Sequence, residues 1–481
     1  MKRRQFLKKL GGASAAVAAL ALDNPLKPAF RIAHADHATF SNRKTLVCVY
    51  LRGGIDGINT VIPHGYLAGT GYYASGFRPT IAVPKPSSSD GTALDLSSLD
   101  PADPANGLGL HPAMTAMHKM YVDGNLAVMP AVHYANASRS HFSGQQYTES
   151  AKFDLETSGW LQRYLADSSS AAASGAMRGA GISSGLPQSL RGQSEVVSTF
   201  SDLRNFELGI ANGADEAEIL AGLVSAYNQT ADPQRLYASV MHDFGRVTIN
   251  DLDVVRELNN AHSPGLDPDT YTTSSTTSDY TSSTFARQLK QTALLIKAGV
   301  GLEVACLSRG GFDTHSNQGI LGGSHAGSIG DVSNNLGAFF DDLNADAMMD
   351  NVLVMIMSEF GRTAYENGSK GTDHAHATSY FVAGTSNTLN SGVYLGHENL
   401  GGAGGSPDFT KPITDWIAYD PLNDAKMVNG RYMNHTIDYQ NVFGEILSEF
   451  LNVNYSGNPQ DISTLLPEFN YSDANKVGFL A

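Results

Sequence analysis

The chain has 481 residues, of which 47 are Asp or Glu and 32 are Lys or Arg, so its net charge is −15. Its length and its apolar content of 42% are sufficient to form a large folded core, which excludes a globally disordered chain. The acidic composition argues against nucleic acid as the main partner, because phosphate binding needs clustered Lys and Arg.

The first 35 residues have the pattern of an export signal. Paired arginines, Arg3 and Arg4, precede the short apolar run GGASAAVAALAL, and an A-x-A cleavage pattern lies at 33–35. The arginine pair and its flanking residues resemble a twin-arginine signal. We therefore expect residues 1–35 to be a signal peptide that the twin-arginine translocase recognises during export. The mature protein is then expected to be periplasmic or secreted.

Five short apolar runs predict buried strands. They are Thr45–Leu51, Asn125–Val132, Leu302–Leu307, Val352–Met357 and Tyr380–Ala383. Helical patterns accompany them at Pro112–Tyr121, Phe285–Gly299, Val332–Leu343 and Ile437–Val453. This alternation predicts that 36–481 form a single α/β domain, with a mostly parallel sheet flanked by helices. The sequence of the mature protein predicts no stable membrane span.

The alternation of strands and helices stops between about 151 and 284. This range contains serine-, threonine- and glycine-rich stretches, and a helical pattern covers Ala214–Leu258. We expect a helical and loop-rich insertion or cap with flexible joints.

Residues that could bind a metal ion or take part in catalysis follow four of the predicted strands. Sites in open α/β sheets lie at the carboxyl ends of strands. They are Asp56 after the first strand, Ser138, Arg139, Ser140 and His141 after the second, Asp313 and His315 after the third, and Glu359, Arg362, Asp373, His374 and His376 after the fourth. Each of them alone is explained equally well as a turn, cap or loop residue. Together, the motifs Asp313-Thr-His315 and Asp373-His374-Ala-His376 indicate a site for one or two divalent ions, such as zinc, manganese, calcium or iron.

Seven stretches carry a resemblance to a known family. They are RGGIDGINTVIP, HPAM, RSHFSGQ, GWLQRYL, GGFDTHSNQ, SEFGRT and GTDHAHA, spread over about 46–451. In order and spacing they resemble the DUF1501 family of exported proteins. That family resembles the alkaline phosphatase superfamily, which includes sulfatases and cofactor-independent phosphoglycerate mutases. The resemblance implies an alkaline-phosphatase-like fold.

The superfamily resemblance also implies a mechanism with two divalent ions at the carboxyl edge of the sheet. Asp56 would bridge to the ions, and Ser140 would attack phosphorus or sulfur, with Ser138 as the second candidate. Arg139 would hold the ester oxyanion. The ions would activate the nucleophile and stabilise the leaving oxygen.

The sequence departs from the superfamily pattern, and two alignments of the ligands follow. In the first, Glu359 and Phe360 replace an Asp-His pair, and His374 or His376 is the last histidine before the next strand; this alignment leaves one complete metal site. In the second, Asp373 and His374 are the Asp-His pair, and His376, His397 or His435 is the last histidine. The spacing Asp313-Thr-His315 is also shorter than the Asp-x-x-x-His of many relatives.

We therefore expect an exported metal-dependent hydrolase of phosphate or sulfate esters, acting on a small-molecule or polymer substrate. The alternative is a non-catalytic periplasmic or surface protein that retains the fold and binds a ligand. A metal-free hydrolase that uses Ser140 and His141 is less favoured, because the chain has no G-x-S-x-G elbow.

Overall fold

The computed structural model describes most of the predicted α/β domain. The described residues are 43–64, 78–87, 89–98, 107–135, 137–153, 158–166, 177–192, 197–206, 268–395, 435–453 and the short stretches 222, 225, 248, 251–252, 254–255, 427–428, 432–433, 462–467, 469, 471 and 476–481. The expected signal peptide, 1–35, lies outside the described residues, and so does most of Ala214–Leu258.

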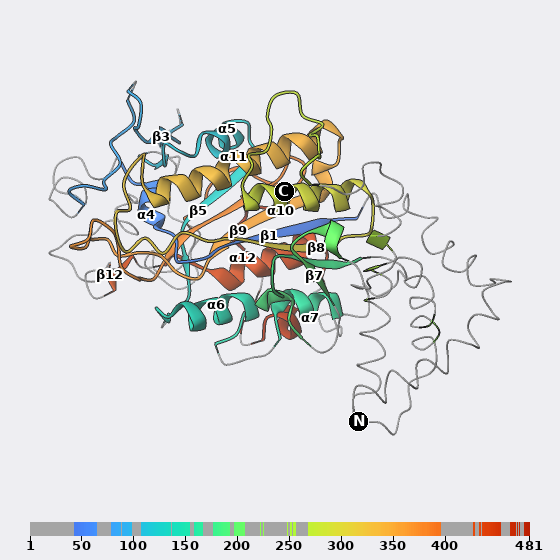
Figure 1. The fold of residues 1–481 in the computed structure, drawn as a ribbon. Helices are drawn as coiled ribbons and strands as arrows, with labels where there is room; N and C mark the ends of the chain where they lie inside the picture. Colours follow the sequence, from blue (N-terminus) through green and yellow to red (C-terminus); the bar gives the residue numbers. More distant parts are fainter. Residues whose placement is uncertain are drawn as a thin grey trace, which may run out of the picture.

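A mixed, mostly parallel sheet forms the centre of the fold (Figure 1). Its strands are β1 (Thr45–Leu51), β5 (Leu126–His133), β6 (Gly179–Ile182), β7 (Ser198–Phe200), β8 (Val304–Arg309), β9 (Val352–Ser358), β10 (Thr378–Ala383), β11 (Gly392–Val393) and β14 (Ile437–Asp438). Their spatial order is β11-β5-β10-β9-β1-β8-β6-β7, and β14 also pairs with β5. Strand β10 is antiparallel to both of its neighbours, whereas the other described pairs of this sheet are parallel.

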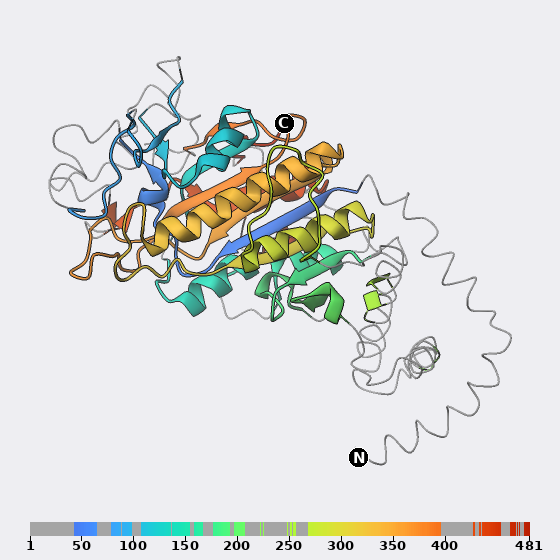
Figure 2. The same ribbon diagram turned by 45° about the horizontal axis from the view of Figure 1, so that its top comes forward.

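Helices cover both faces of the sheet (Figures 1 and 2). On one face lie α5 (Thr115–Val122), α10 (Thr284–Lys297) and α11 (Ser324–Ala345), and on the other lie α6 (His141–Ser150), α7 (Trp160–Ala166) and α12 (Tyr439–Glu445). All seven residues of β1 are therefore buried, and its alternate side chains enter the two separate apolar clusters on either side of the sheet. A strand that is buried on both faces has a continuous apolar sequence, which is why β1 was predictable as a run.

Smaller elements surround this framework. A three-stranded sheet contains β2 (Val61–Ile62), β3 (Leu94–Asp95) and β4 (Gly109–Leu110), and a two-stranded one contains β12 (Met427–Val428) and β13 (Tyr432–Met433). The remaining described helices are α4 (Gly57–Thr60), α13 (Ile462–Leu465), a π-helical turn at Ile446–Phe450 and 3₁₀ turns at Gln188–Leu190, Leu203–Asn205 and Met349–Asn351. No described helix combines the length and the apolar character that crossing a bilayer would require.

Two of the predicted helices have different bounds in the structure. Helix α11 extends from Ser324 to Ala345 and is nearly twice as long as the predicted Val332–Leu343. The predicted helix at Ile437–Val453 begins later, because Ile437 and Asp438 pair with β5 and the Asp438 carboxylate then accepts the main-chain N–H of Gln440 as an N-cap.

The expected insertion at about 151–284 contributes to the central sheet. Strand β6 pairs with β8, β7 extends the sheet beyond β6, and α7 covers one face. The serine- and threonine-rich stretch near 271–281 contacts α11, because the buried Asp342 carboxylate accepts hydrogen bonds from the hydroxyls of Tyr271 and Tyr280 at 2.5 and 3.0 Å. The described part of this range is therefore integrated into the domain.

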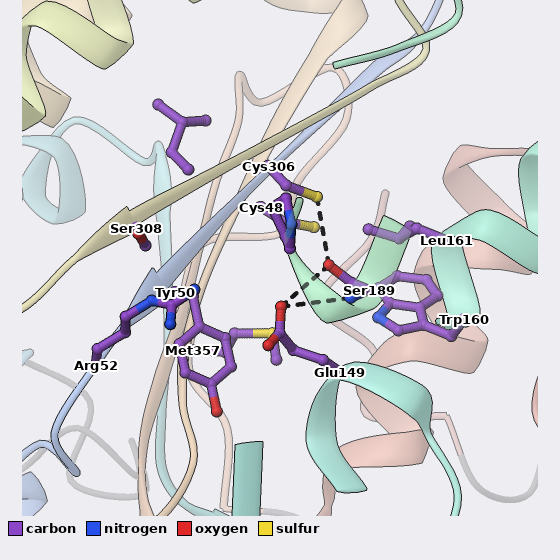
Figure 3. A pocket seen from close by; sticks show the side chains of 12 residues that line it. Cys48, Tyr50, Arg52, Glu149, Trp160, Leu161, Ser189, Cys306, Ser308 and Met357 are labelled. Carbon is purple, nitrogen blue, oxygen red and sulfur yellow. Dashed lines mark hydrogen bonds between the residues drawn. The ribbon is translucent and has the colours of Figure 1, made fainter. Parts of the chain in front are cut away.

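A small pocket lies beside the sheet next to the two cysteines (Figure 3). Cys48 and Cys306 are neighbours in the register of β1 and β8, and both are buried free thiols. The hydroxyl of Ser189 links Cys306 to the buried carboxylate of Glu149, with distances of 3.5 Å to the Cys306 sulfur and 3.3 Å to Glu149. Burial raises the pKa of both the Cys48 thiol and the Glu149 carboxyl.

The contact between α7 and α12 provides a test of this packing. The rings of Trp160 and Phe443 are stacked with centroids 4.3 Å apart, and both residues are fully buried. We expect Phe443→Ala to lower the free energy of unfolding by about 3–5 kcal/mol, because it leaves a cavity beside Trp160. Chemical denaturation would measure this loss. The matched control is Phe142→Ala, whose side chain is 89% exposed, and a comparable loss in that variant would contradict the assignment.

Candidate metal centre

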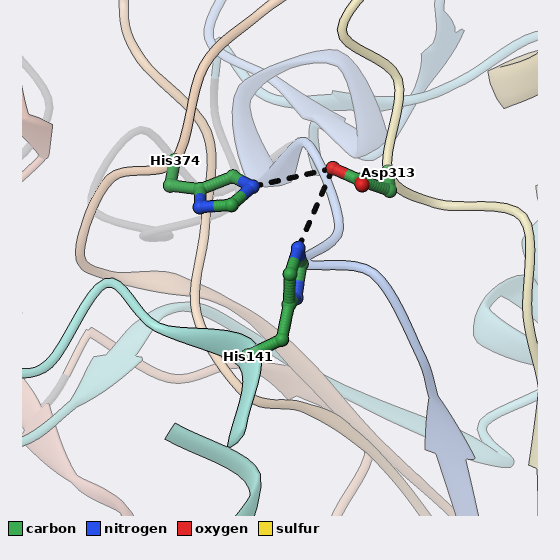
Figure 4. Close-up of side chains that lie close together, drawn as sticks. All are labelled: His141, Asp313 and His374. Carbon is green, nitrogen blue, oxygen red and sulfur yellow. Dashed lines mark hydrogen bonds and ion pairs between the residues drawn. The ribbon is translucent and has the colours of Figure 1, made fainter. Parts of the chain in front are cut away.

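Three side chains from distant parts of the chain converge at the carboxyl edge of the sheet (Figure 4). His141 is the first residue of α6, Asp313 follows β8, and His374 precedes β10. Their possible ligand atoms all lie within 4.8 Å of one another. The Asp313 Oδ1 atom is 3.3 Å from His374 Nε2 and 3.5 Å from His141 Nε2.

A third imidazole adjoins this group. The Nε2 atom of His315 lies 3.1 Å from Asp313 Oδ1 and 2.9 Å from His374 Nε2. The cluster therefore consists of a carboxylate oxygen within 3.5 Å of three imidazole nitrogens, contributed by His141, His315 and His374.

Each imidazole is oriented by an oxygen atom on its Nδ1 side. The pairs are His141 with Glu359 Oε1 at 2.8 Å, His315 with Asp373 Oδ1 at 3.1 Å and His374 with the main-chain oxygen of Arg139 at 2.9 Å. A carboxylate or carbonyl oxygen accepts a hydrogen bond from the Nδ1–H group of a neutral ring, which leaves the lone pair on Nε2. This is the arrangement in which metal-binding histidines are usually held.

The donor set fits a divalent cation. Lone pairs of His315 and His374 face each other at 2.9 Å, and the buried His141 Nε2 atom has no hydrogen-bond partner within the described part of the chain. A cation between the lone pairs removes their repulsion. With Zn–N bonds of 2.0–2.1 Å, ligand atoms in a tetrahedral site are about 3.3 Å apart, close to the 3.1, 3.3 and 3.5 Å that separate Asp313 Oδ1 from the three imidazole nitrogens. Two histidines and one carboxylate also suit iron.

Arg362 fixes the carboxylate of the cluster. Its fully buried guanidinium donates hydrogen bonds to Asp313 Oδ1 and to the main-chain oxygens of Gly53, Gly54 and Thr372. Burial opposes the charged form of Asp313, but the hydrogen bond and charge of Arg362 outweigh it and lower the pKa of Asp313 to about 2. Asp313 is therefore ionised at neutral pH and able to bind a cation.

The environments of the His141 and His374 imidazoles shift their pKa values in opposite directions. The hydrogen bond to Glu359 raises the pKa of His141 against the opposing effect of burial. Burial, together with the positive charge of Arg362, lowers the pKa of His374. His374 is therefore held in the neutral form that a metal ion requires.

Phe360 forms a rigid wall beneath these two rings. It is fully buried, and its ring centroid lies 4.9 Å from those of both His141 and His374. Gly54 has a φ of +72°, and a Cβ atom there would lie 2.5 Å from the Phe360 ring. Glycine at 54 thus allows the loop after β1 to approach the wall of the site.

The structure brings together part of the predicted ligand set. Asp313, His315 and His374 converge, whereas Glu359 and Asp373 contact the Nδ1 atoms of His141 and His315. His141 was not predicted as a ligand. The signal that could have found it is its place in the loop segment that follows the second predicted strand, nine residues after Val132.

Asp56 lies outside this cluster, in a buried ion pair. Arg78 donates to both carboxylate oxygens, at 2.6 and 3.0 Å, and the Gln318 amide donates at 2.6 Å. The same carboxylate caps α4 by accepting the main-chain N–H of Asn59. Burial opposes ionisation of Asp56, but Arg78 outweighs it and lowers the pKa. Arg78 therefore neutralises the carboxylate that the superfamily resemblance assigned to the ions.

The remaining predicted residues lie at the border of the cluster. The ring of His376 stacks on Tyr432 with centroids 5.1 Å apart, and burial, with the charge of Arg139, lowers its pKa to about 4. The Arg139 guanidinium bonds to the Tyr432 hydroxyl, so Arg139 contacts the cluster through its main-chain oxygen. Ser140 is the exposed N-cap residue of α6, and Ser138 Oγ accepts its main-chain N–H.

A family model supplies the relationship of the chain to known proteins. Residues 43–444 match the model described as a protein of unknown function, DUF1501. The chain belongs to the DUF1501 family. No curated protein and no solved structure matches it.

The role of Glu359 in this DUF1501 protein is testable. The Glu359 side chain is 3% exposed and orients His141, so we expect Glu359→Gln to weaken metal binding by about 10–100-fold. Competition with a chromophoric chelator would measure the affinity. The control is Glu449→Gln, in an ion pair with Lys476 whose two side chains are 38% and 31% exposed. Equal affinities in both variants would contradict this role of Glu359.

Asp56 offers a second test, which separates an ion pair from a metal ligand. We expect Asp56→Leu to destabilise the fold by about 3–5 kcal/mol, because Arg78 then remains buried without a counter-charge. The double variant Asp56→Leu/Arg78→Met is expected to recover the part of that loss that comes from the unpaired guanidinium, although Gln318 and the N–H of Asn59 still lack the Asp56 acceptor, and to bind metal like the wild type. Loss of metal from the folded double variant would instead identify Asp56 as a ligand.

Proposed function

We propose that this DUF1501 protein is an exported metal-dependent hydrolase of phosphate or sulfate esters, with an alkaline-phosphatase-like fold. The observation that carries the proposal is the convergence of three oriented imidazoles on Asp313 Oδ1. All four side chains are between 26% and 50% exposed, so a substrate can reach them. The cluster lies where strands β8 and β9 end, which is the usual place for a site in such a sheet.

The proposal uses a single ion. His141, Asp313 and His374 would hold it, and His315 would complete the set. An ion bound there would polarise the ester oxygen and favour deprotonation of a nearby hydroxyl or water. The guanidinium of Arg78 beside Asp56 and the phenyl ring of Phe360 argue against a second ion, which supports the alignment with one complete metal site.

Ser140 is the proposed nucleophile. It precedes the ligand His141, it is exposed, and its side chain does not cap α6. Its hydroxyl is therefore not required for the helix cap and is available for reaction. The first N–H groups of α6 point towards the same end of the helix, where they can stabilise negative charge on the ester oxygens. Ser138 supports Ser140 by accepting its main-chain N–H at 3.2 Å.

Elemental analysis of the purified mature protein is the first test. We expect a single equivalent of zinc, iron or manganese in the wild type and its loss in Asp313→Ala/His374→Ala, because the shared oxygen and one fixed imidazole are removed. The control is His118→Ala, whose ring contacts the main-chain oxygen of Asp95 away from the cluster. A metal-free wild type that also resists reloading would contradict the proposal.

Activity is then measured on aryl phosphates, phosphodiesters and aryl sulfates. Turnover is expected for the wild type, and Ser140→Ala should lower kcat by orders of magnitude while metal content is unchanged. Bound metal without turnover on any ester would favour the ligand-binding alternative. Full activity of Ser140→Ala would instead assign the attack to water.

A further inference from the structure

The cluster presents four donors, and four protein ligands would close a tetrahedral ion. Catalytic zinc sites keep a position open for water or substrate, whereas structural sites are closed. We infer that His315 is an exchangeable ligand, which caps the ion in the resting protein and leaves when an anionic substrate oxygen takes its place. This inference rests on the metal site of the proposed function and assigns its regulation to one residue.

The buried side chains of Glu359 and Phe360 support two of the imidazoles, those of His141 and His374. The Glu359 carboxylate that holds His141 is itself held by the main-chain N–H of Gly53, at 2.8 Å, and by the Ser358 hydroxyl, at 3.1 Å. His374 is held by a main-chain oxygen, and both rings pack on Phe360. The exposed fractions of the His141 and His374 side chains are 32% and 26%. Moving either ring requires a rearrangement of the wall of the site.

His315 is held in a different way. Its side chain is 45% exposed, and the Asp373 carboxylate that orients it is 46% exposed. His315 lies in the loop between β8 and α11, and its ring contacts the ring of His374 at 4.7 Å. It also lies outside the group of atoms that are all within 4.8 Å of one another, which contains His141, Asp313 and His374. A side-chain rotation of His315 therefore leaves the pairing of the strands and the other ligands intact.

The loop after β9 provides a fixed support for this movement. The Asn367 amide donates to Asp373 Oδ1 at 2.9 Å and to the main-chain oxygen of His315 at 3.0 Å. Its own oxygen accepts the main-chain N–H groups of Ser369 and Gly371, which fixes the orientation of the amide. The backbone of His315 and the Asp373 carboxylate thus stay in place while the imidazole turns.

The exchange needs no covalent step. A substrate oxygen would take the place of His315 Nε2 on the ion, and the ring proton would stay on Nδ1. His141, Asp313 and His374 would continue to hold the ion. His315 would thus shield the ion from other ligands until an anion of sufficient affinity binds.

Cobalt-loaded protein tests this inference without turnover. We expect His315→Ala to retain a single equivalent of Co²⁺ with lower affinity, whereas His141→Ala and His374→Ala lose it. Inorganic phosphate should change the visible spectrum of the wild type towards a new coordination. If His315 caps the ion about nine-tenths of the time, His315→Ala binds phosphate about tenfold more tightly. His315→Gln is a second variant, and His118→Ala is the control.

Two results would overturn the inference. Loss of Co²⁺ from folded His315→Ala, as complete as in His374→Ala, would make His315 a permanent ligand. An unchanged spectrum and unchanged phosphate affinity in His315→Ala and His315→Gln would show that it is not a ligand. These results leave the proposed hydrolase standing, whereas a wild-type protein that binds no metal removes both. Ligand exchange without ester turnover would support the inference and contradict the hydrolase.

Discussion

The buried guanidinium of Arg362 is the interaction on which the site depends. It connects the ends of three strands, because it donates to the oxygens of Gly53 and Gly54 after β1, to Asp313 after β8 and to Thr372 before β10. A buried charge of this kind is tolerated when it is fully hydrogen-bonded and paired. These contacts supply Arg362 with hydrogen-bond acceptors and a counter-charge. Because Arg362 lowers its pKa, Asp313 remains ionised beside the imidazoles.

The contact between Arg362 and Asp313 also limits how strongly this carboxylate can attract a cation. A carboxylate that is shared with a guanidinium has less charge to offer a cation, so in the proposed site the imidazoles would supply much of the affinity for the ion. Neutral imidazoles bind metal well when the other ring nitrogen is held by an acceptor, and each ring here has such an acceptor. The acceptor of His141 is buried, with Glu359 3% exposed, whereas the acceptor of His315 is not, with Asp373 46% exposed, so the two proposed ligands are supported differently.

The sequence predicted the central strands of the sheet well and the strands near one of its edges poorly. The strands at Thr45–Leu51 and Val352–Met357 were found within one residue, because strands buried on both faces have continuous apolar runs. Strands β6 and β7 were missed, since GAGI and STF carry small or polar side chains and little apolar signal. The direction of β10 was also not predictable, because a short apolar run has the same composition in either orientation.

In the candidate site, sequence motifs indicated some of the residues but not the contacts that each residue makes. Two short motifs after strands pointed to Asp313, His315, Asp373 and His374, and these side chains lie next to one another in the structure. Their role as metal ligands stays a prediction. The pairing of Asp56 with Arg78 had no sequence signal, since Arg78 lies 22 residues further along and contributes no motif of its own. The superfamily resemblance therefore assigned Asp56 to the ions, whereas the structure gives that carboxylate a guanidinium. An ion pair can occupy the place of a second metal because both neutralise a buried carboxylate, and the difference between them appears only in the three-dimensional contacts.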